Sequence, residues 1–258
     1  MANEDEVVIS AVRDEIGWIT LNRPEKRNAL NEELIAALKT AFRQAERNQA
    51  VRAIVLSGSG ADFCSGADLS ALQMISQASV SENQDDARSL MELFLLIRRL
   101  KVPVIAAVRG RALAGGSGLA GACDIVLASS SARFGYPEVK IGFVPAMVMA
   151  ILRRNVSEKR AFELITRGGD IAAAEAERIG LVNKVLSDDG FESEVEAYAR
   201  GFQNVSRSAA TLTKQLLYQM DGMAFDEAIE TGVDVNVIAR MTADCQKGIA
   251  AFLKRASK

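Results

Sequence analysis

Histidine is absent from this chain of 258 residues. Without an imidazole, a single chain cannot form a Ser-His-Asp or Cys-His triad or a histidine-ligated zinc site. Any proton transfer must therefore use carboxylates, Lys, Tyr, Cys or water. Cysteine is also scarce. Cys64, Cys123 and Cys245 are widely spaced and odd in number, so they form no metal or redox motif and are typical of a reducing compartment.

The chain also lacks an excess of basic residues and a long apolar run. Lys and Arg number 31 against 33 Asp and Glu, which gives no positive field to attract nucleic acid. No apolar stretch approaches the roughly 20 residues of a membrane-spanning helix, and the acidic start MANEDE is unlike a signal or transit peptide. We therefore expect a cytoplasmic protein without nucleic-acid or membrane partners.

Short apolar strands that alternate with amphipathic helices predict an α/β fold with a partly parallel sheet. Strands are expected at Val7–Val12, Ile16–Leu21, Ala53–Ser57 and Val102–Val108, and a helix at about Asn31–Asn48. The Ser- and Gln-rich stretch up to Asp86 is weakly patterned, so we expect it to be mobile in the absence of ligand, and a helix follows over Ala87–Leu100.

From Pro145 onward the pattern predicts helices, interrupted only by a short strand at Val182–Val185. The expected organisation is an α/β core over residues 1–185 and a C-terminal helical region over residues 186–258. That region is too thin to bury its own apolar faces. It should therefore pack on the core and on a neighbouring subunit.

The segment Ala114–Glu138 combines two ingredients of catalysis. Gly115 and Gly116 open a helix, whose first N–H groups lack intrahelical partners and lie at the positive end of the helix dipole. Such a terminus can hold developing negative charge on an oxygen atom. Glu138, next to a proline, supplies a proton donor or acceptor. Taken alone, the glycines would indicate only close helix packing, and Glu138 an ordinary surface carboxylate.

Several segments, in this order, resemble the crotonase superfamily, the enoyl-CoA hydratase/isomerase group. They are NRPEKRNAL, FCSGADL, VRGRALAGGSGLAGACDI, FGYPEVKIGFVP, DIAAAEAERIGLVNKV and KGIAAFLKR, and together they span nearly the whole chain. The resemblance implies a spiral of β-β-α turns with a C-terminal helical trimerisation region. It also implies an acyl-CoA thioester substrate, no separate cofactor or metal, and a homotrimer or dimer of trimers.

By motif position, the resemblance places an oxyanion hole on the backbone N–H groups of Ala67 and Gly115, with Glu138 as the acid-base group. Two preorganised donors would stabilise the enolate formed from a thioester. Asp68 would support the loop rather than act chemically, and Lys254 and Arg255 could reach a neighbour's nucleotide. The residues implied in substrate or CoA binding are Lys26, Arg27, Ser65, Gly66, Ala67, Asp68, Leu69, Gly115, Gly118 and Tyr136.

The sequence departs from this family at Gly118, where hydratases commonly carry a second glutamate. With Glu138 alone, backbone or hydroxyl groups such as Ser117 or Tyr136 would have to help hold the attacking water. General acid-base assistance is worth about 10² to 10⁴ in rate. We predict an enoyl-CoA hydratase. The alternatives are a 3,2-enoyl-CoA isomerase, which needs only one base, and a catalytically silent acyl-CoA-binding protein.

Two further expectations concern residues around this site. The apolar neighbours of Glu138, taken to be Phe134, Phe143 and Val144, should raise the pKa of its carboxyl group by desolvation. Asp124, at the start of a strand, is expected to cap or brace the same loop as Asp68.

Overall fold

The computed structural model describes residues 6–256. Its strands are β1 (Val8–Arg13), β2 (Ile16–Leu21), β3 (Ala53–Gly58), β4 (Val104–Val108), β5 (Arg111–Leu113), β6 (Ile125–Ser129), β7 (Arg133–Gly135), β8 (Asp170–Ala172) and β9 (Lys184–Leu186). Within the described range, one sheet has the order β1-β2-β3-β4-β6-β9 and a second has the order β5-β7-β8. The larger sheet is parallel except for the antiparallel pair β1–β2. The expected α/β class is confirmed.

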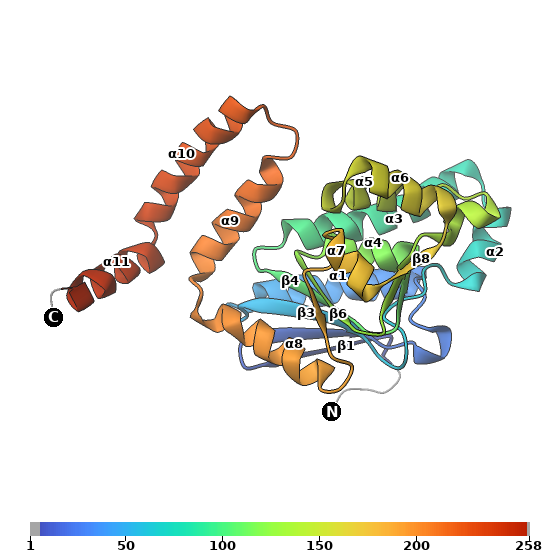
Figure 1. The fold of residues 1–258 in the computed structure, drawn as a ribbon, viewed down its shortest axis with the longest axis horizontal. Helices are drawn as coiled ribbons and strands as arrows, with labels where there is room; N and C mark the ends of the chain where they lie inside the picture. The colour runs from blue at the N-terminus through green and yellow to red at the C-terminus, as the bar shows by residue number, and fades with distance from the viewer. Residues whose placement is uncertain (1–5, 257–258) are drawn as a thin grey trace.

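Helices cover the sheets and continue beyond them (Figure 1). The α-helices are α1 (Glu32–Arg47), α2 (Leu69–Gln77), α3 (Val80–Arg99), α4 (Gly115–Ala122), α5 (Ala146–Asn155), α6 (Glu158–Arg167), α7 (Ala173–Arg178), α8 (Phe191–Arg200), α9 (Arg207–Gln219), α10 (Phe225–Met241) and α11 (Ala243–Ala256). Short 3-10 helices are η1 (Pro24–Lys26), η2 (Pro137–Ile141) and η3 (Gly201–Asn204). None of the described helices is both long and apolar enough to cross a membrane.

The larger sheet has the pattern expected of parallel strands covered on both faces. Every residue of β4 is buried, as is typical of strands sandwiched between helices. On one side α1 begins where the Asn31 side chain accepts a hydrogen bond from Leu34 N at 2.9 Å. Its apolar face, which includes Leu34, Leu38 and Phe42, is buried in the main core. The apolar residues that recur at helical spacing in the sequence therefore form the buried face of α1.

The sequence analysis did not predict the small sheet β5-β7-β8, although it determines where the site lies. Strands β5 and β7 are parallel, with Leu113 opposite Gly135. The two strands therefore end at the same edge of this sheet. The chain continues from β5 into α4, which begins at Gly115, and from β7 into η2, which contains Glu138. Three-residue strands carry too little periodicity to be recognised in a sequence, and β8 also interrupts the expected run of C-terminal helices.

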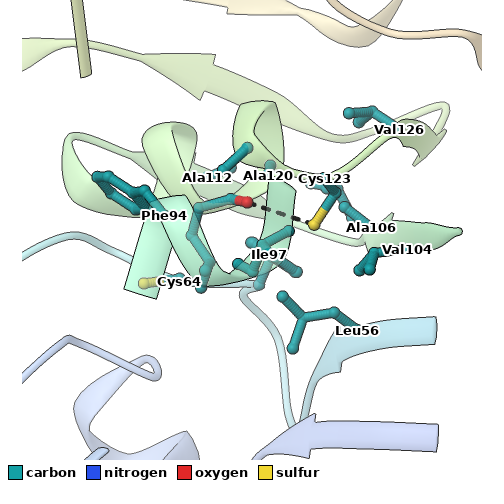
Figure 2. Packing of buried hydrophobic residues seen from close by; sticks show 14 of the residues in the cluster. Leu56, Cys64, Phe94, Ile97, Val104, Ala106, Ala112, Ala120, Cys123 and Val126 are labelled. Carbon is teal, nitrogen blue, oxygen red and sulfur yellow. Dashed lines mark hydrogen bonds between the residues drawn. The ribbon is translucent and has the colours of Figure 1, made fainter. Parts of the chain in front are cut away.

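Helix α4 lies inside the core, and its small residues permit this position. Residues Gly116 to Ala122 are all buried. Figure 2 shows α4 surrounded by side chains from neighbouring elements, among them Leu56, Phe94 and Ile97. Cys64 also lies in this cluster, and burial raises the pKa of its thiol to about 12. The thiol is therefore protonated at neutral pH and is not a reactive nucleophile.

The stretch from Leu69 to Asp86 forms α2 and the start of α3, apart from Ala78 and Ser79, and its mobility without ligand stays a prediction. Asp68 caps α2 by accepting a hydrogen bond from Ser70 N at 3.1 Å. Ser79 and Glu82 form a capping box that starts α3 several residues earlier than predicted. Polar residues dominate because much of this segment faces solvent. In the sequence, the capping residues Asp68 and Ser79 indicate where these two helices begin, whereas an apolar stripe does not.

The C-terminal region divides into a part that packs on the core and a part that leaves it. Helix α8 buries Phe191, Val195 and Ala199 against the larger sheet. Helices α10 and α11 extend away from the α/β body (Figure 1), and neither has a buried residue. Large apolar side chains on α10 are exposed: Phe225, Ile229, Val233, Val237 and Met241. The division at residue 185 remains a prediction.

A buried ion pair fixes α9 to the core. The Lys214 ammonium group, 6% exposed, donates to Asp124 Oδ2 at 2.7 Å and to the Ile97 carbonyl at 2.9 Å. Tyr218 Oη donates to the other Asp124 oxygen at 2.5 Å. Burial lowers the pKa of Lys214, and the Asp124 carboxylate offsets part of that shift. Asp124 therefore braces α9 and the start of β4, not the loop that carries Asp68.

We expect Lys214→Ala to lower the free energy of unfolding by about 3 kcal/mol, because it leaves a largely buried carboxylate without its cation. Urea denaturation followed by circular dichroism measures this value. Lys159→Ala, which removes an exposed lysine from α6, should change it by less than about 0.5 kcal/mol. Equal effects of the two substitutions would show that the buried pair does not hold α9.

Candidate active site

A cavity of about 640 Å³ lies at the edge where β5 and β7 end. Its lining comes from α2, α3, the start of α4, and the segment from η2 into α5. Among the residues predicted for the site, it brings together Ser65, Ala67, Gly115 and Glu138. Most of the remaining lining is apolar, including Leu72, Ile75, Leu90, Phe143 and Val144. The arrangement suits an apolar ligand with a polar group at one end.

The Ala67 N–H points away from the neighbouring strand. Leu30 forms an isolated parallel bridge with Ala67: its N–H donates to Gly66 O at 2.7 Å, and its carbonyl accepts from Asp68 N at 3.0 Å. In such a bridge the intervening residue directs its own N–H to the other side. Among the described residues, the Ala67 N–H has no protein acceptor. It remains available to a ligand in the cavity.

The second N–H belongs to Gly115, the first residue of α4, which has no intrahelical acceptor. The chain turns into this helix at Ala114, whose φ of +51° lies in the left-handed half of backbone space. For a non-glycine residue this conformation costs about 1 to 3 kcal/mol. The Ala114 N–H donates to Gly135 O at 2.9 Å, which ties the turn to β7. The positive end of α4 thus faces the cavity.

Two glycines let the backbone segments that carry these N–H groups approach closely. A Cβ atom on Gly116 would lie 2.2 Å from the Cys64 carbonyl oxygen, a distance no real side chain tolerates. Gly66 has φ +97°, and a Cβ there would lie 2.9 Å from the Ala114 Cβ. The loop and the start of α4 are therefore in backbone contact. This contact holds the two donors on one side of the cavity.

An ion pair supports the loop from behind. Arg23 Nη2 lies 2.7 Å from Asp68 Oδ2, and Arg23 Nη1 donates to the Ala29 carbonyl at 2.6 Å. The Arg23 guanidinium holds the pKa of Asp68 below its ordinary value, so this carboxyl stays ionised. Asn28, fully buried, donates to the Ser59 and Asp62 carbonyls. The NRP…N segment thus braces the loop, and Asp68 has the supporting place expected of it.

Glu138 has the environment of an acid-base group. It follows Pro137 in the first turn of η2, is half-buried and lines the cavity. Its Oε2 atom is buried and, among the described residues, has no hydrogen-bond partner. Desolvation raises the pKa of this carboxyl, and its own backbone N–H offsets part of the shift. A buried acid with a raised pKa in a cavity is a candidate for proton transfer.

The expected direction of the Glu138 pKa shift is therefore confirmed, and two of the three apolar neighbours are placed as predicted. Phe143 and Val144 line the same cavity as Glu138. Phe134 is 1% exposed and belongs to the main core, outside the cavity lining.

Other predicted residues lie outside the cavity lining. Lys26 and Arg27 are exposed in and after η1, where Arg27 is 4.0 Å from Asp62. The side chain of Leu69 lies outside the described part of the structure. Tyr136 is 1% exposed. The Ser117 hydroxyl is buried and donates to the Ala112 carbonyl at 2.6 Å. The expectation that Ser117 or Tyr136 helps to hold a water molecule in the cavity is therefore wrong.

Gly118 is buried in α4, and the space next to it is occupied. A Cβ atom built on Gly118 would lie 2.8 Å from Val148 Cγ2 and 3.0 Å from Phe94 Cζ. Val148 is itself part of the cavity lining. A side chain at this position would have to displace both neighbours. Position 118 therefore carries no carboxylate, and a larger residue there would require Val148 and Phe94 to move.

The sequence analysis missed the cavity residues from α2 and α3, among them Asn83, Asp86 and Leu90. Most of that segment shows only a weak apolar pattern, so the sequence does not indicate which residues face the cavity. Lys140 was also missed, although it lies only two residues after Glu138 of the recognised Pro-Glu pair. The capping signals at Asp68 and Ser79 would have revealed the two helices, but not which of their faces lines a cavity.

Comparisons with known proteins agree with this geometry. The family model described as "Enoyl-CoA hydratase/isomerase" matches residues 11–258. A Thermus thermophilus protein named as an enoyl-CoA hydratase is 38% identical over 96% of this chain and 98% of its own length. The crystal structure of an enoyl-CoA hydratase from Mycobacterium smegmatis has 32% identity and a TM-score of 0.92, with 96% of each chain covered.

A second crystal structure, of an enoyl-CoA hydratase subunit from Geobacillus kaustophilus, has 31% identity and a TM-score of 0.91. It covers 98% of this chain and 97% of its own chain. The agreement in sequence, fold and length extends over both the α/β body and the C-terminal helices. The chain is therefore an enzyme of the enoyl-CoA hydratase/isomerase family, within the crotonase superfamily.

Proposed function

We propose that this chain hydrates 2-enoyl-CoA thioesters, using the Ala67 and Gly115 N–H groups as the oxyanion hole and Glu138 as its single acid-base residue. One observation carries the proposal: within residues 6–256, two N–H groups without protein acceptors share a cavity with a carboxyl oxygen that also lacks a partner. The names of the relatives favour hydration over other reactions of the family. Coenzyme A enters as part of the substrate, so no separate cofactor or metal is proposed.

The proposed reaction needs one proton carrier. The thioester oxygen accepts hydrogen bonds from both N–H groups while water adds to C3, and the electron pair of the double bond moves onto that oxygen as an enolate. Glu138 takes a proton from the water and returns one to C2, which restores the thioester. Preorganised donors stabilise charge that develops only during the reaction, and each is worth about 10² to 10³ in rate.

A 3,2-enoyl-CoA isomerase is the second candidate, and the occupied space beside Gly118 favours it. Phe94 and Val148 lie where a second carboxylate would extend, so water has one carboxylate to orient it instead of two. Isomerisation requires no water. Glu138 would remove a proton from C2 of a 3-enoyl thioester and return it to C4, with the same enolate held between the two N–H groups.

Absorbance of the conjugated thioester separates these reactions. Loss of absorbance with 2-enoyl-CoA and formation of 3-hydroxyacyl product would support hydration. A rise with 3-enoyl-CoA that is not followed by a loss would support isomerisation in its place. Tight binding of CoA esters without either reaction, and unaffected by Glu138→Ala, would overturn both and leave a catalytically silent acyl-CoA-binding protein.

The proposal includes a homotrimer or a dimer of trimers. Five of the exposed apolar residues on α10 recur at every fourth position, from Phe225 to Met241, and form a stripe that winds slowly around the helix. A stripe of this length on a helix that leaves its own core is typical of a subunit interface. Light scattering should give a mass three or six times the 27.7 kDa of one chain. A monomer at micromolar concentration would contradict this assembly.

A further inference from the structure

The part of the cavity formed by α3 is polar at one end. Asn83, Asp86, Ala87 and Leu90 all line the cavity from this helix. The amide of Asn83 is engaged, because its Nδ2 donates to the Ile75 and Ala78 carbonyls at 3.3 and 3.2 Å. Asp86, by contrast, forms no hydrogen bond or ion pair within the described part of the chain. It is a carboxylate whose acceptors are not used by other side chains of the mostly apolar lining.

Another polar residue of the lining, Asn31, already uses its side-chain oxygen in a hydrogen bond. Asn31 lines the cavity, but its Oδ1 caps α1 through the hydrogen bond from Leu34 N. Partial burial against the cavity raises the pKa of Asp86, and the nearby charge of Glu32 raises it further. Among the carboxylates of the described lining, Glu138 and Asp86 come from different elements, η2 and α3. They mark two separate polar points of one ligand cavity.

Positions along α3 give the distance between Asp86 and the turn of this helix that lies against α4. Phe94 lies next to Gly118, one turn into the helix that begins with the Gly115 N–H. Residue 94 follows residue 86 by eight positions on α3, which is about 12 Å along the helix axis. An extended acyl chain of about ten carbons spans this distance. Each C–C bond is about 1.5 Å long, and because the chain zigzags, each bond adds less than 1.5 Å to the length of the chain.

We infer that Asp86 is a specificity-determining residue, which selects acyl groups of about ten carbons that carry a hydroxyl group at the end remote from the thioester. The inference rests on the proposed function, because it takes this cavity as the acyl-binding site. A hydroxyl group at that end donates a hydrogen bond to the Asp86 carboxylate. A terminal methyl group removes water from that carboxylate without replacing its hydrogen bonds, and a terminal carboxylate is repelled by it.

Direct binding measurements with saturated CoA esters test this without requiring turnover. The probes are decanoyl-CoA, 10-hydroxydecanoyl-CoA and the CoA monoester of decanedioic acid. Because Asp86 remains solvent-exposed on one side, we expect the wild-type protein to bind the hydroxy ester about tenfold more tightly than decanoyl-CoA, the value of one charge-assisted hydrogen bond. The dicarboxylic ester should bind most weakly.

Asp86→Leu should reverse the preference, so that decanoyl-CoA binds more tightly than the hydroxy ester. Asp85→Leu is the matched control, because Asp85 is the adjacent residue, pairs with Arg88 at 3.6 Å and does not line the cavity. It should leave the wild-type ratio unchanged. An unchanged ratio in Asp86→Leu would overturn the inference.

The same data separate this inference from the proposed reaction. Absence of turnover together with an Asp86-dependent binding preference would refute the hydratase and isomerase proposals and support the role of Asp86. Turnover without that preference would support the proposed reactions and refute the role of Asp86.

Discussion

Glu138→Gln should lower kcat/KM for the enoyl-CoA substrate by about 10² to 10⁴, the usual value of general acid-base assistance. The amide keeps the size of the side chain but can neither take up nor return a proton at neutral pH. Because the oxyanion donors come from the backbone, the affinity for a saturated acyl-CoA should change little. A stopped assay with 2-enoyl-CoA and a binding titration together provide both values.

Glu25→Gln is the matched control for this substitution. Glu25 also follows a proline in the first turn of a 3-10 helix, but it is exposed and lies outside the cavity lining. Its replacement should leave kcat/KM within about twofold of the wild-type value, as expected for a surface residue that contacts no ligand. Equal losses in the two variants would remove Glu138 from the mechanism.

The raised pKa of Glu138 also predicts how activity and stability change with pH. In either proposed reaction the first proton moves to Glu138, so the ionised form is active and the rate falls as pH decreases through a pKa above the ordinary value of 4.5. For folding, protonated Glu138 is favoured in the native state. Its stabilising contribution is therefore complete below about pH 4.5 and is lost as pH rises through the native pKa.

Glu138→Gln tests the sign of this stability effect, because glutamine remains neutral. The variant should be more stable than the wild-type protein at pH 7, and the difference should disappear at low pH. Urea denaturation at several pH values measures it. A variant that is less stable than wild type at pH 7 would show that ionised Glu138 is stabilised by its surroundings.

Gly116→Ala should cause a large loss of both stability and activity. The new Cβ would lie 2.2 Å from the Cys64 carbonyl oxygen and 2.9 Å from its carbonyl carbon, and neither backbone atom can rotate away. The helix and the loop must separate, which should cost about 3 kcal/mol of unfolding free energy, the upper part of the range for overpacking. The same movement separates the two N–H groups, and a misplacement of about 1 Å costs about 10² in rate.

Gly232→Ala provides the comparison, because it makes the same change in helix α10, where a Cβ meets no atom within 4 Å. Alanine is the better helix former, so this variant should gain up to about 1 kcal/mol. Thermal unfolding and kcat/KM measured on both variants separate helix propensity from backbone contact. Normal activity and stability in Gly116→Ala would contradict the close approach of the loop and α4.

Elements that a periodic apolar pattern defines were predictable from the sequence. The helix expected over Asn31–Asn48 is α1 with its two caps, and the helices expected from Pro145 onward are present as α5 to α11. Elements defined by local hydrogen bonds were missed. Helix α2 has few apolar positions and is marked chiefly by the Asp68 cap, and β5, β7 and β8 are too short to show alternation.

For the site, the sequence motif located Ala67, Gly115 and Glu138 correctly at one cavity, since local turns determine their positions. It failed for residues whose direction depends on distant packing. Tyr136 and Ser117 belong to the same motif region but face the core. Asp86 lines the cavity because of how α3 packs in the folded chain, and the local sequence pattern does not show this.

The positive φ of Ala114 has a consequence for engineering a more heat-resistant form of this enzyme. Glycine would relieve the native conformation at that turn, yet it would also give the unfolded chain more conformational entropy to lose. It would in addition remove the methyl group against which Gly66 packs. The entropy cost and the lost methyl contact offset part of this relief, so Gly232 in α10, where a Cβ meets no neighbour, is the simpler position at which to raise thermostability.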